Sequence, residues 1–333
     1  MNLVTGATGL LGTHVLLELL SRGESVKALY RSEDSKNEVK RVFQFYDSEG
    51  LFSKIQWVHG DIMDVFSLID AMEGVDYVVH CAAIVSYHKK DRKEMYRINV
   101  EGTTNVVSAA LEVGVKKLCH VSSIAALRRA EDGAAVTEAG EWLDSDLNTH
   151  YGITKHLAEM EIWRGIQEGL NAVIVNPGLI IGPGNFDRSS GSLFSKLDEG
   201  LKFYPPGGTG FVGAADTARL IVLSTKSEVN EERFIAVSES LSMKEVFTKI
   251  CQELGKPLPE REAKPWMLTV ARWAEALKEL FTGKKALVTK ETVRNASSRY
   301  YYSSEKSKKI FAMEYTPIAQ SIEQTAVYFK QKR

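Results

Sequence analysis

The chain has 333 residues, of which 44% are hydrophobic, and carries 42 basic against 43 acidic side chains. That length and apolar fraction suit a globular protein with a full core in one large domain or two moderate ones. The formal net charge of −1 gives no electrostatic reason to expect nucleic acid or an anionic membrane as partner. We therefore expect a small molecule as the main binding partner.

The three cysteines, Cys81, Cys119 and Cys251, lie far apart in the chain. Their spacing matches neither a zinc site nor the disulfide framework of a small secreted domain, so we predict no bound metal and a cytoplasmic location. The apolar N-terminus lacks a basic leader and is interrupted by glycines, unlike a signal peptide. No stretch approaches the roughly 18 apolar residues of a membrane span, so we expect no integral membrane segment.

Short apolar runs alternate with amphipathic stretches through the first half of the chain. Strands are predicted at Asn2–Thr5, Val26–Tyr30, Ile55–Val58, Val75–His80, Lys117–Val121 and Ala172–Val175. Helices are predicted at Leu10–Arg22, Val65–Met72, Lys93–Val113 and Thr149–Glu168. This alternation is typical of an α/β fold with a doubly wound parallel sheet and helices on both faces.

The pattern changes after Pro177, where glycines and prolines cluster before longer amphipathic segments. We predict a first domain over residues 1–176 and a smaller C-terminal α/β lobe over residues 177–333, with residues 209–236 returning to the first domain. In the second lobe, Trp266–Phe281 has large apolar residues at helical spacing. An ordinary packing helix is the favoured interpretation, and a cover over an apolar substrate or a membrane contact is the alternative.

A glycine-rich turn joins the first strand directly to the first helix, which is the context that a dinucleotide fingerprint requires. Glycines there let the backbone turn sharply and approach a pyrophosphate, and the helix N-terminus offers unpaired N–H groups to the phosphates. A glycine turn with a packing role alone is the less favoured alternative. The predicted pyrophosphate contacts are Gly6, Thr8, Gly9, Leu10 and Gly12.

The second strand ends in Arg31, where NAD-binding versions of this motif carry an acidic residue for the ribose hydroxyls. An arginine suits the additional phosphate of NADP. NADP is therefore the favoured cofactor. NAD stays possible, because Arg31 could be a solvated loop residue and Glu33 or Asp34 could reach a ribose.

Tyr151 and Lys155 lie four residues apart in a segment of helical periodicity, so they project from one face. A free tyrosine has a pKa near ~10 and needs a nearby cation to exchange protons near neutral pH. Lys155 supplies that charge. The spacing alone is common on exposed helices, and it gains weight only from the glycine loop before it and from Ser122 and Ser123 at the end of a later strand.

This ordered set resembles the extended short-chain dehydrogenases/reductases, the epimerase/dehydratase superfamily, whose first domain is a Rossmann-type fold. The resemblance implies Ser123, preferred over the adjacent Ser122, as the catalytic hydroxyl, with Tyr151 as the proton donor and Lys155 as its activator. It also implies Asn99 as the family's helix asparagine. The remaining implied cofactor contacts are Asp61, Ile62, Cys81, Ala82, Ala83, Tyr151, Lys155 and Pro177. Structural alternatives stay open: Asp61 as a helix cap, Asn99 as a hydrogen-bonding residue inside the helix and Cys81 as a core residue.

Two branches of this family differ in their substrates. Sugar-nucleotide enzymes carry arginines for the diphosphate, which this chain lacks around Ala172–Gly178 and Gly208–Gly213, although Arg188, Lys196 or Lys202 could take that role. The chain instead resembles the dihydroflavonol-reductase-like branch, which implies reduction of a ketone or aldehyde, or the reverse oxidation. A nucleotide-sugar epimerase or dehydratase and a non-catalytic dinucleotide-binding regulator are the alternatives. The family also suggests a possible homodimer, and Tyr87 and His88 are candidate substrate neighbours.

Overall fold

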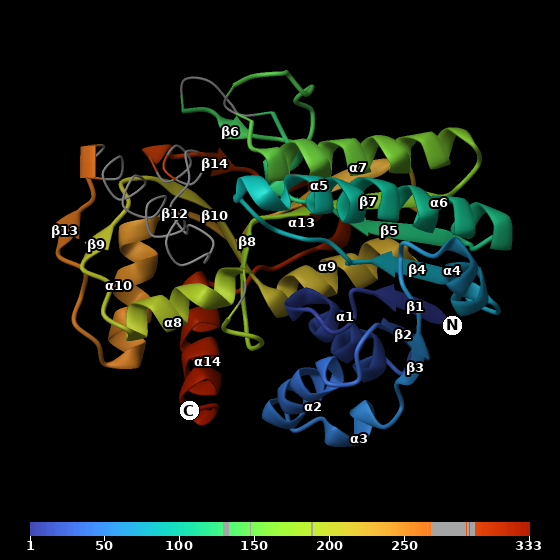
Figure 1. Ribbon diagram of the computed structural model, residues 1–333, viewed down its shortest axis with the longest axis horizontal. Helices are drawn as coiled ribbons and strands as arrows, with labels where there is room; N and C mark the ends of the chain where they lie inside the picture. Colours follow the sequence, from blue (N-terminus) through green and yellow to red (C-terminus); the bar gives the residue numbers. More distant parts are fainter. Residues whose placement is uncertain are drawn as a thin grey trace.

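The computed structural model describes residues 1–128, 133–146, 148–187, 189–264, 266–267, 291, 293 and 297–333 (Figure 1). The helix predicted at Trp266–Phe281 lies outside these ranges except for its first two residues, and Arg188 lies outside them as well. Within the described ranges, every helix is too short or too polar to cross a lipid bilayer.

A seven-stranded parallel sheet forms the centre of the molecule, in the strand order β11-β7-β5-β4-β1-β2-β3. Most of its strands are buried on both faces, which is why they appear in the sequence as short continuous apolar runs. The predicted doubly wound, Rossmann-type α/β fold is confirmed. The strands are β1 (Asn2–Thr5), β2 (Val26–Tyr30), β3 (Gln56–His59), β4 (Tyr77–His80), β5 (Lys117–Val121), β7 (Ala172–Pro177) and β11 (Glu232–Ala236).

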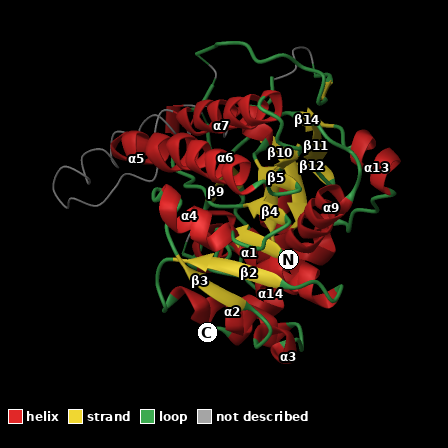
Figure 2. Ribbon diagram, turned by 90° about the vertical axis from the view of Figure 1, so that its right-hand side faces the viewer, coloured by secondary structure: helices red, strands yellow, loops and turns green. Residues whose placement is uncertain are grey.

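Helices cover both faces of this sheet (Figure 2). One layer consists of α1 (Leu10–Ser21), α2 (Ser35–Phe45) and α9 (Ala214–Lys226), and the other of α4 (Val65–Met72), α6 (Gly102–Val113) and α7 (His150–Gln167). Leu16 and Leu19 of α1 belong to the core of the first layer, and Val106 and Ile162 to the core of the second. The N-termini of α1 and α7 therefore lie on opposite faces, both at the carboxyl edge of the sheet.

The predicted elements agree with the observed ones to within about two residues at each end, with two differences. The predicted helix at Lys93–Val113 is divided into α5 (Arg92–Tyr96), a π-helical turn (Arg97–Glu101) and α6. The helices α2 and α3 (Glu49–Phe52) were not predicted. α2 is largely polar but strongly amphipathic, with Val39, Val42 and Phe43 buried on one face, so helical periodicity was present in its sequence and was overlooked.

The C-terminal part of the chain builds a small sheet of β8 (Leu179–Ile181), β10 (Gly208–Gly213) and β12 (Glu239–Ser242). Helices α8 (Ser192–Asp198), α10 (Met243–Leu254) and α14 (Ile318–Gln331) share one apolar core with it, around Phe194 and Phe211. Between these elements, α9 returns to pack on α1, and β11 joins the main sheet. The short elements are β6 (Ala135–Val136), β9 (Phe203–Tyr204), β13 (Arg261–Glu262), β14 (Tyr301–Tyr302) and α13 (Glu305–Phe311).

Candidate active site

The glycine loop between β1 and α1 is packed too tightly for side chains. Gly6 has φ +63°, and a Cβ on it would lie 2.6 Å from the Ala82 nitrogen. A Cβ on Gly12 would lie 2.2 Å from the Gly6 carbonyl oxygen, so the first turn of α1 rests directly on the loop. Gly9, which has no side chain, takes the N-cap position of α1. The loop therefore presents backbone N–H groups at a helix N-terminus, an arrangement that suits a pyrophosphate.

Arg31 and Asp61 meet at the carboxyl ends of β2 and β3, with 3.9 Å between the Arg31 NH1 and Asp61 Oδ2 atoms. The Arg31 side chain is 67% exposed and faces open solvent. Asp61 accepts a hydrogen bond from the Met63 N–H, whereas Asp64 caps α4. The capping role that was an alternative for Asp61 thus belongs to Asp64. Ile62 is buried and would collide with a Cβ on Gly102.

The segment after β4, Cys81 to Ala83, runs beside the glycine loop. The Cys81 N–H donates to the Thr5 carbonyl, and burial raises the pKa of the Cys81 thiol. Asn99, in the π-helical turn, binds both backbone groups of Ile84, the residue that follows Ala83. Its Oδ1 accepts from the Ile84 N–H at 2.7 Å, and its Nδ2 donates to the Ile84 carbonyl at 2.9 Å. The same Nδ2 donates to Thr154 of α7. Asn99 therefore fastens this segment to the helix that carries Tyr151.

The N-terminus of α7 is built against the turn that follows β5. Thr149 caps α7 by accepting from the Gly152 N–H, and a Cβ on Gly152 would lie 2.5 Å from the Ala125 carbonyl oxygen. Ser123 caps that turn, accepting from the Ala125 N–H at 3.1 Å. This close packing places the side chains of Ser123 and Tyr151 next to each other.

Tyr151 is buried, and burial raises the pKa of its phenol; the neighbouring Tyr87 adds to this rise and the Ser123 hydroxyl opposes it. The expected lowering of this pKa by Lys155 is not found, because burial of the phenol dominates. The Tyr87 ring stands edge-on to the Tyr151 ring, with 6.3 Å between centroids. The structure therefore places Tyr87 next to the predicted proton donor. His88 is farther along the same segment, where its side chain accepts from the Lys90 N–H.

Lys155 lies one helical turn beyond Tyr151 and is only 2% exposed. Its Nζ donates to the Val121 carbonyl at the end of β5, at 2.6 Å. Burial lowers the pKa of Lys155 to about 8, although the nearby Glu159 and Cys81 counteract the effect. Ser123, Tyr151 and Lys155, which are spread over 33 residues, thus converge at the carboxyl end of one strand.

Two buried histidines on β4 and β5 lie in the same region. His80 bonds Thr5 through Nδ1 and Thr103 through Nε2, and its ring centroid is 5.3 Å from that of His120. Burial and the charge of Lys155 lower the pKa of His80 to about 3 and that of His120 well below its usual value. Both rings are therefore neutral near pH 7, and Lys155 is the cation among these three groups.

The predicted site does not include Glu159, a carboxylate that is 1% exposed on α7. It lies four residues after Lys155 and eight after Tyr151, so helical spacing alone places it on their face. Its partners, Asn176 of β7 and Arg233 of β11, are distant in sequence and gave no signal. The predicted contact Pro177 ends β7, directly after Asn176, and is buried.

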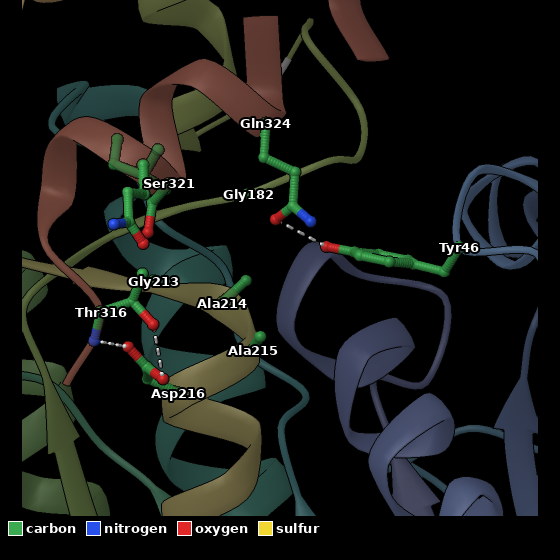
Figure 3. Close-up of a pocket in the computed structure, with 11 residues that line it drawn as sticks. Tyr46, Gly182, Gly213, Ala214, Ala215, Asp216, Thr316, Ser321 and Gln324 are labelled. Carbon is green, nitrogen blue, oxygen red and sulfur yellow. Dashed lines mark hydrogen bonds between the residues drawn. The ribbon is translucent and has the colours of Figure 1, made fainter. Parts of the chain in front are cut away.

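A cavity of about 290 Å³ lies on the other face of the sheet, between the start of α9, the residues around Gly182, Tyr46 and α14 (Figure 3). There Asp216 accepts from the Thr316 N–H at 2.6 Å, and the Tyr46 hydroxyl donates to Gln324 at 3.3 Å. These bonds join the C-terminal segment to the main sheet and its helices. The cavity is separate from Ser123, Tyr151 and Lys155, which lie on the face of the sheet that α7 covers.

Lys196 and Lys202, the alternative candidates for binding a diphosphate, are both exposed. Lys196 lies on α8, and Lys202 follows that helix. Throughout the part of the chain that the structure describes, acidic, histidine and cysteine side chains form no cluster of three that could hold a metal ion.

Comparison with known proteins agrees with this geometry. Residues 2–202 match the family model described as NAD dependent epimerase/dehydratase family. The chain is 31% identical to the sterol demethylase protein B of Methylococcus capsulatus, over 80% of this chain and 78% of that protein. It is 26% identical to a putative dihydroflavonol 4-reductase of Synechocystis, over 98% of this chain and 94% of that protein.

Among solved structures, the protein gox2253 superposes with a TM-score of 0.82 and 27% identity, over 100% of this chain and 98% of that chain. The family match covers the glycine loop, Ser123 and the Tyr151–Lys155 pair. The chain therefore belongs to the NAD-dependent epimerase/dehydratase family and is an NAD(P)-dependent enzyme of the extended short-chain dehydrogenase/reductase type.

Proposed function

We propose that this enzyme reduces a ketone or aldehyde with NADPH, or catalyses the reverse alcohol oxidation, through Ser123, Tyr151 and Lys155. The observation that carries the proposal is the convergence of Ser123 and Tyr151 beside the buried Lys155, whose Nζ is held by the Val121 carbonyl at the end of the strand that leads to Ser123. A carbonyl oxygen placed between the two hydroxyls would accept a hydrogen bond from each. This pair of donors is what a developing alkoxide needs.

In the direction of reduction, the Tyr151 phenol, which carries its proton near pH 7, would donate it to the substrate oxygen. Because burial raises the pKa of this phenol, the transfer needs a cation that stabilises the tyrosinate. Ser123 would orient the substrate oxygen and donate to it. Lys155 lies one helical turn from Tyr151 and, with a pKa of about 8, stays mostly protonated at pH 7, so its charge would supply that stabilisation.

The residues present fit a dinucleotide. The glycine loop is a cradle that any Cβ at Gly6 or Gly12 would fill, and it opens on the first turn of α1. The bound nicotinamide would supply the hydride. We assign the pyrophosphate to Gly6, Thr8, Gly9, Leu10 and Gly12, the adenosine to Arg31, Asp61 and Ile62, and the nicotinamide half to Cys81, Ala82, Ala83, Tyr151, Lys155 and Pro177.

The preference for NADP rests on Arg31. Its guanidinium is exposed at the end of β2, near Asp61, and is available for a phosphate on the adenosine ribose. Asn99 would act indirectly, because all of its described hydrogen bonds go to protein groups that shape the segment after β4.

A substrate of low polarity is favoured over a sugar nucleotide. Tyr87 places an aromatic ring against Tyr151, where it would border the substrate. The sequence also lacks the arginines with which the sugar-nucleotide branch binds a diphosphate. We assign the substrate lobe to residues 177–333 without residues 209–236, which return to the first domain. A cytoplasmic homodimer stays a prediction.

Turnover against two parallel substrate panels tests the function. NADPH consumption would be measured with apolar and aromatic ketones and aldehydes in one panel, and NADH would replace NADPH in matched runs. In the other panel, sugar nucleotides would be incubated with the oxidised cofactor and their products separated by chromatography, because epimerisation and dehydration return the hydride to the substrate and consume no net cofactor. The proposal expects activity in the carbonyl panel. Activity confined to sugar nucleotides would establish the epimerase or dehydratase alternative, and cofactor binding without any turnover would favour the non-catalytic regulator.

A further inference from the structure

The buried carboxylate of Glu159 is connected to two members of the proposed catalytic group. Its Oε1 accepts from the Asn176 Nδ2 at 2.6 Å, and its Oε2 lies 3.4 Å from the Arg233 NH1. Both carboxylate oxygens therefore face donors, which is the arrangement that suits an ionised acid. Lys155 is one helical turn away on the same face of α7.

Asn176 extends this contact to Ser123. Its Nδ2 donates one hydrogen bond to Glu159 and another, at 3.0 Å, to the Ser123 carbonyl. Both N–H groups of the amide are thus used, and the backbone carbonyl of Ser123 is held by Asn176. A shift of Glu159 would be transmitted to the Ser123 backbone through Asn176.

Arg233 holds the other oxygen of Glu159 and is itself held in place. Its guanidinium donates to the Glu138 carbonyl at 2.9 and 2.6 Å and to the Gly140 carbonyl at 2.8 Å. The Glu138 carboxylate in turn accepts from the Ile235 N–H of β11. Glu159 is therefore anchored to the sheet edge through an arginine whose own orientation is fixed by three backbone bonds.

We propose that Glu159 is a positioning residue for the reductase: it fixes Ser123 through Asn176 and supplies the negative charge that keeps Lys155 protonated. The proposal rests on the function proposed above. Burial raises the pKa of Glu159, and the Ser122 hydroxyl, the charge of Arg233, the bond from Asn176 and the charge of Lys155 oppose that rise. The other titratable groups that face Lys155 are Tyr151, Cys81, His80 and His120. With the phenol, the thiol and both imidazoles neutral near pH 7, Glu159 is the negatively charged group among them.

A direct titration of Lys155 tests whether the charge of Glu159 keeps this lysine protonated. In protein labelled with ¹³C at the lysine ε-carbon, NMR would follow the Lys155 signal against pH, with the signal assigned by its loss in Lys155→Met. Glu159→Gln keeps the shape and an acceptor for Asn176 but removes the charge. We expect the midpoint of Lys155 to fall by about one pH unit, because a nearby opposite charge favours the ionised form.

Glu161→Gln is the matched control on the same helix. Glu161 pairs with Arg164 away from the catalytic group, so its removal should leave the Lys155 midpoint unchanged. This titration needs neither substrate nor turnover, so it decides the role of Glu159 even if the proposed reductase activity is not found. An unchanged Lys155 midpoint in folded Glu159→Gln would overturn the proposal.

Kinetics test the link to Ser123. With a substrate from the carbonyl panel, Asn176→Ala should lower kcat about tenfold with a smaller effect on KM, since it releases the Ser123 backbone. The Lys155 midpoint should change little in this variant. In Glu159→Gln the alkaline fall of kcat should move to lower pH together with the NMR midpoint. A loss of thermal stability in Glu159→Gln, with kcat and its pH profile unchanged, would show a purely structural role and contradict the proposal.

Discussion

Gly12 of α1 lies so close to Gly6 that a Cβ on Gly12 would stand 2.2 Å from the Gly6 carbonyl oxygen. That oxygen belongs to the backbone, which cannot move aside as the end of a flexible side chain could. Gly6 itself is held at φ +63° against the Ala82 backbone. The shape of the proposed pyrophosphate site therefore depends on the absence of a single methyl group.

Gly12→Ala should open the loop and weaken cofactor binding at least about tenfold, with a loss of about 1–3 kcal/mol in the free energy of unfolding. Calorimetric titration with NADPH and urea unfolding measure the two effects. Gly50→Ala is the control, because among the described residues a Cβ on Gly50 would meet no heavy atom within 4 Å. Equal cofactor affinity in Gly12→Ala and the native chain would contradict this account of the loop.

Lys155→Met should stabilise the fold near neutral pH while abolishing activity. The pKa of Lys155 is about 8 in the folded chain against a reference of 10.5, so below pH 8 folding includes the cost of burying a charge, on the order of 3 kcal/mol. Between about pH 8 and 10.5 the unfolded chain binds more protons, so the native chain gains stability as the pH rises. The advantage of the methionine variant should shrink over that window.

Urea unfolding of Lys155→Met and the native chain at pH 7 and pH 10 checks this dependence. Lys54→Met replaces an exposed lysine and should change the free energy of unfolding by less than about 0.5 kcal/mol at both values. The difference in unfolding free energy between Lys155→Met and the native chain could instead be the same at pH 7 and pH 10. That result would show that burying the charge of Lys155 costs the folded protein no stability.

Ser123→Ala should lower kcat by about a hundredfold, since it removes a donor to the developing alkoxide. Ser122→Ala should cost less than about tenfold, because Ser122 is buried at the end of β5 while Ser123 contacts Tyr151. Steady-state kinetics on the best substrate of the carbonyl panel separate the two serines. The reverse ranking would move the catalytic hydroxyl to Ser122.

Arg31→Asp should raise the dissociation constant of NADPH at least about tenfold and leave that of NADH nearly unchanged, because the arginine would meet only the additional phosphate. Fluorescence titration with both cofactors measures the change. Arg41→Asp, an exposed arginine on α2 that pairs with Glu38, controls for overall charge. Parallel weakening of both cofactors in Arg31→Asp would refute the assigned role.

Local sequence patterns predicted the parts of the site that short-range physics determines. The strand ahead of the glycine loop is a buried apolar run, and Tyr151 and Lys155 share a face by helical spacing. The π-helical turn at Asn99 was not predictable, because one extra residue in a helix barely alters its apolar periodicity. The ion pair of Arg233 with Glu159 joins residues 74 positions apart, which only the order of strands in the sheet brings together.

Tyr151 is the proposed donor of the proton to a carbonyl substrate, and the variant Tyr151→Phe removes that proton while keeping the ring. Its NADPH-dependent turnover would be measured beside its NADPH dissociation constant. We expect kcat to fall at least about a thousandfold, with cofactor affinity within about twofold of the native chain. Turnover retained in Tyr151→Phe would show that another group donates the proton.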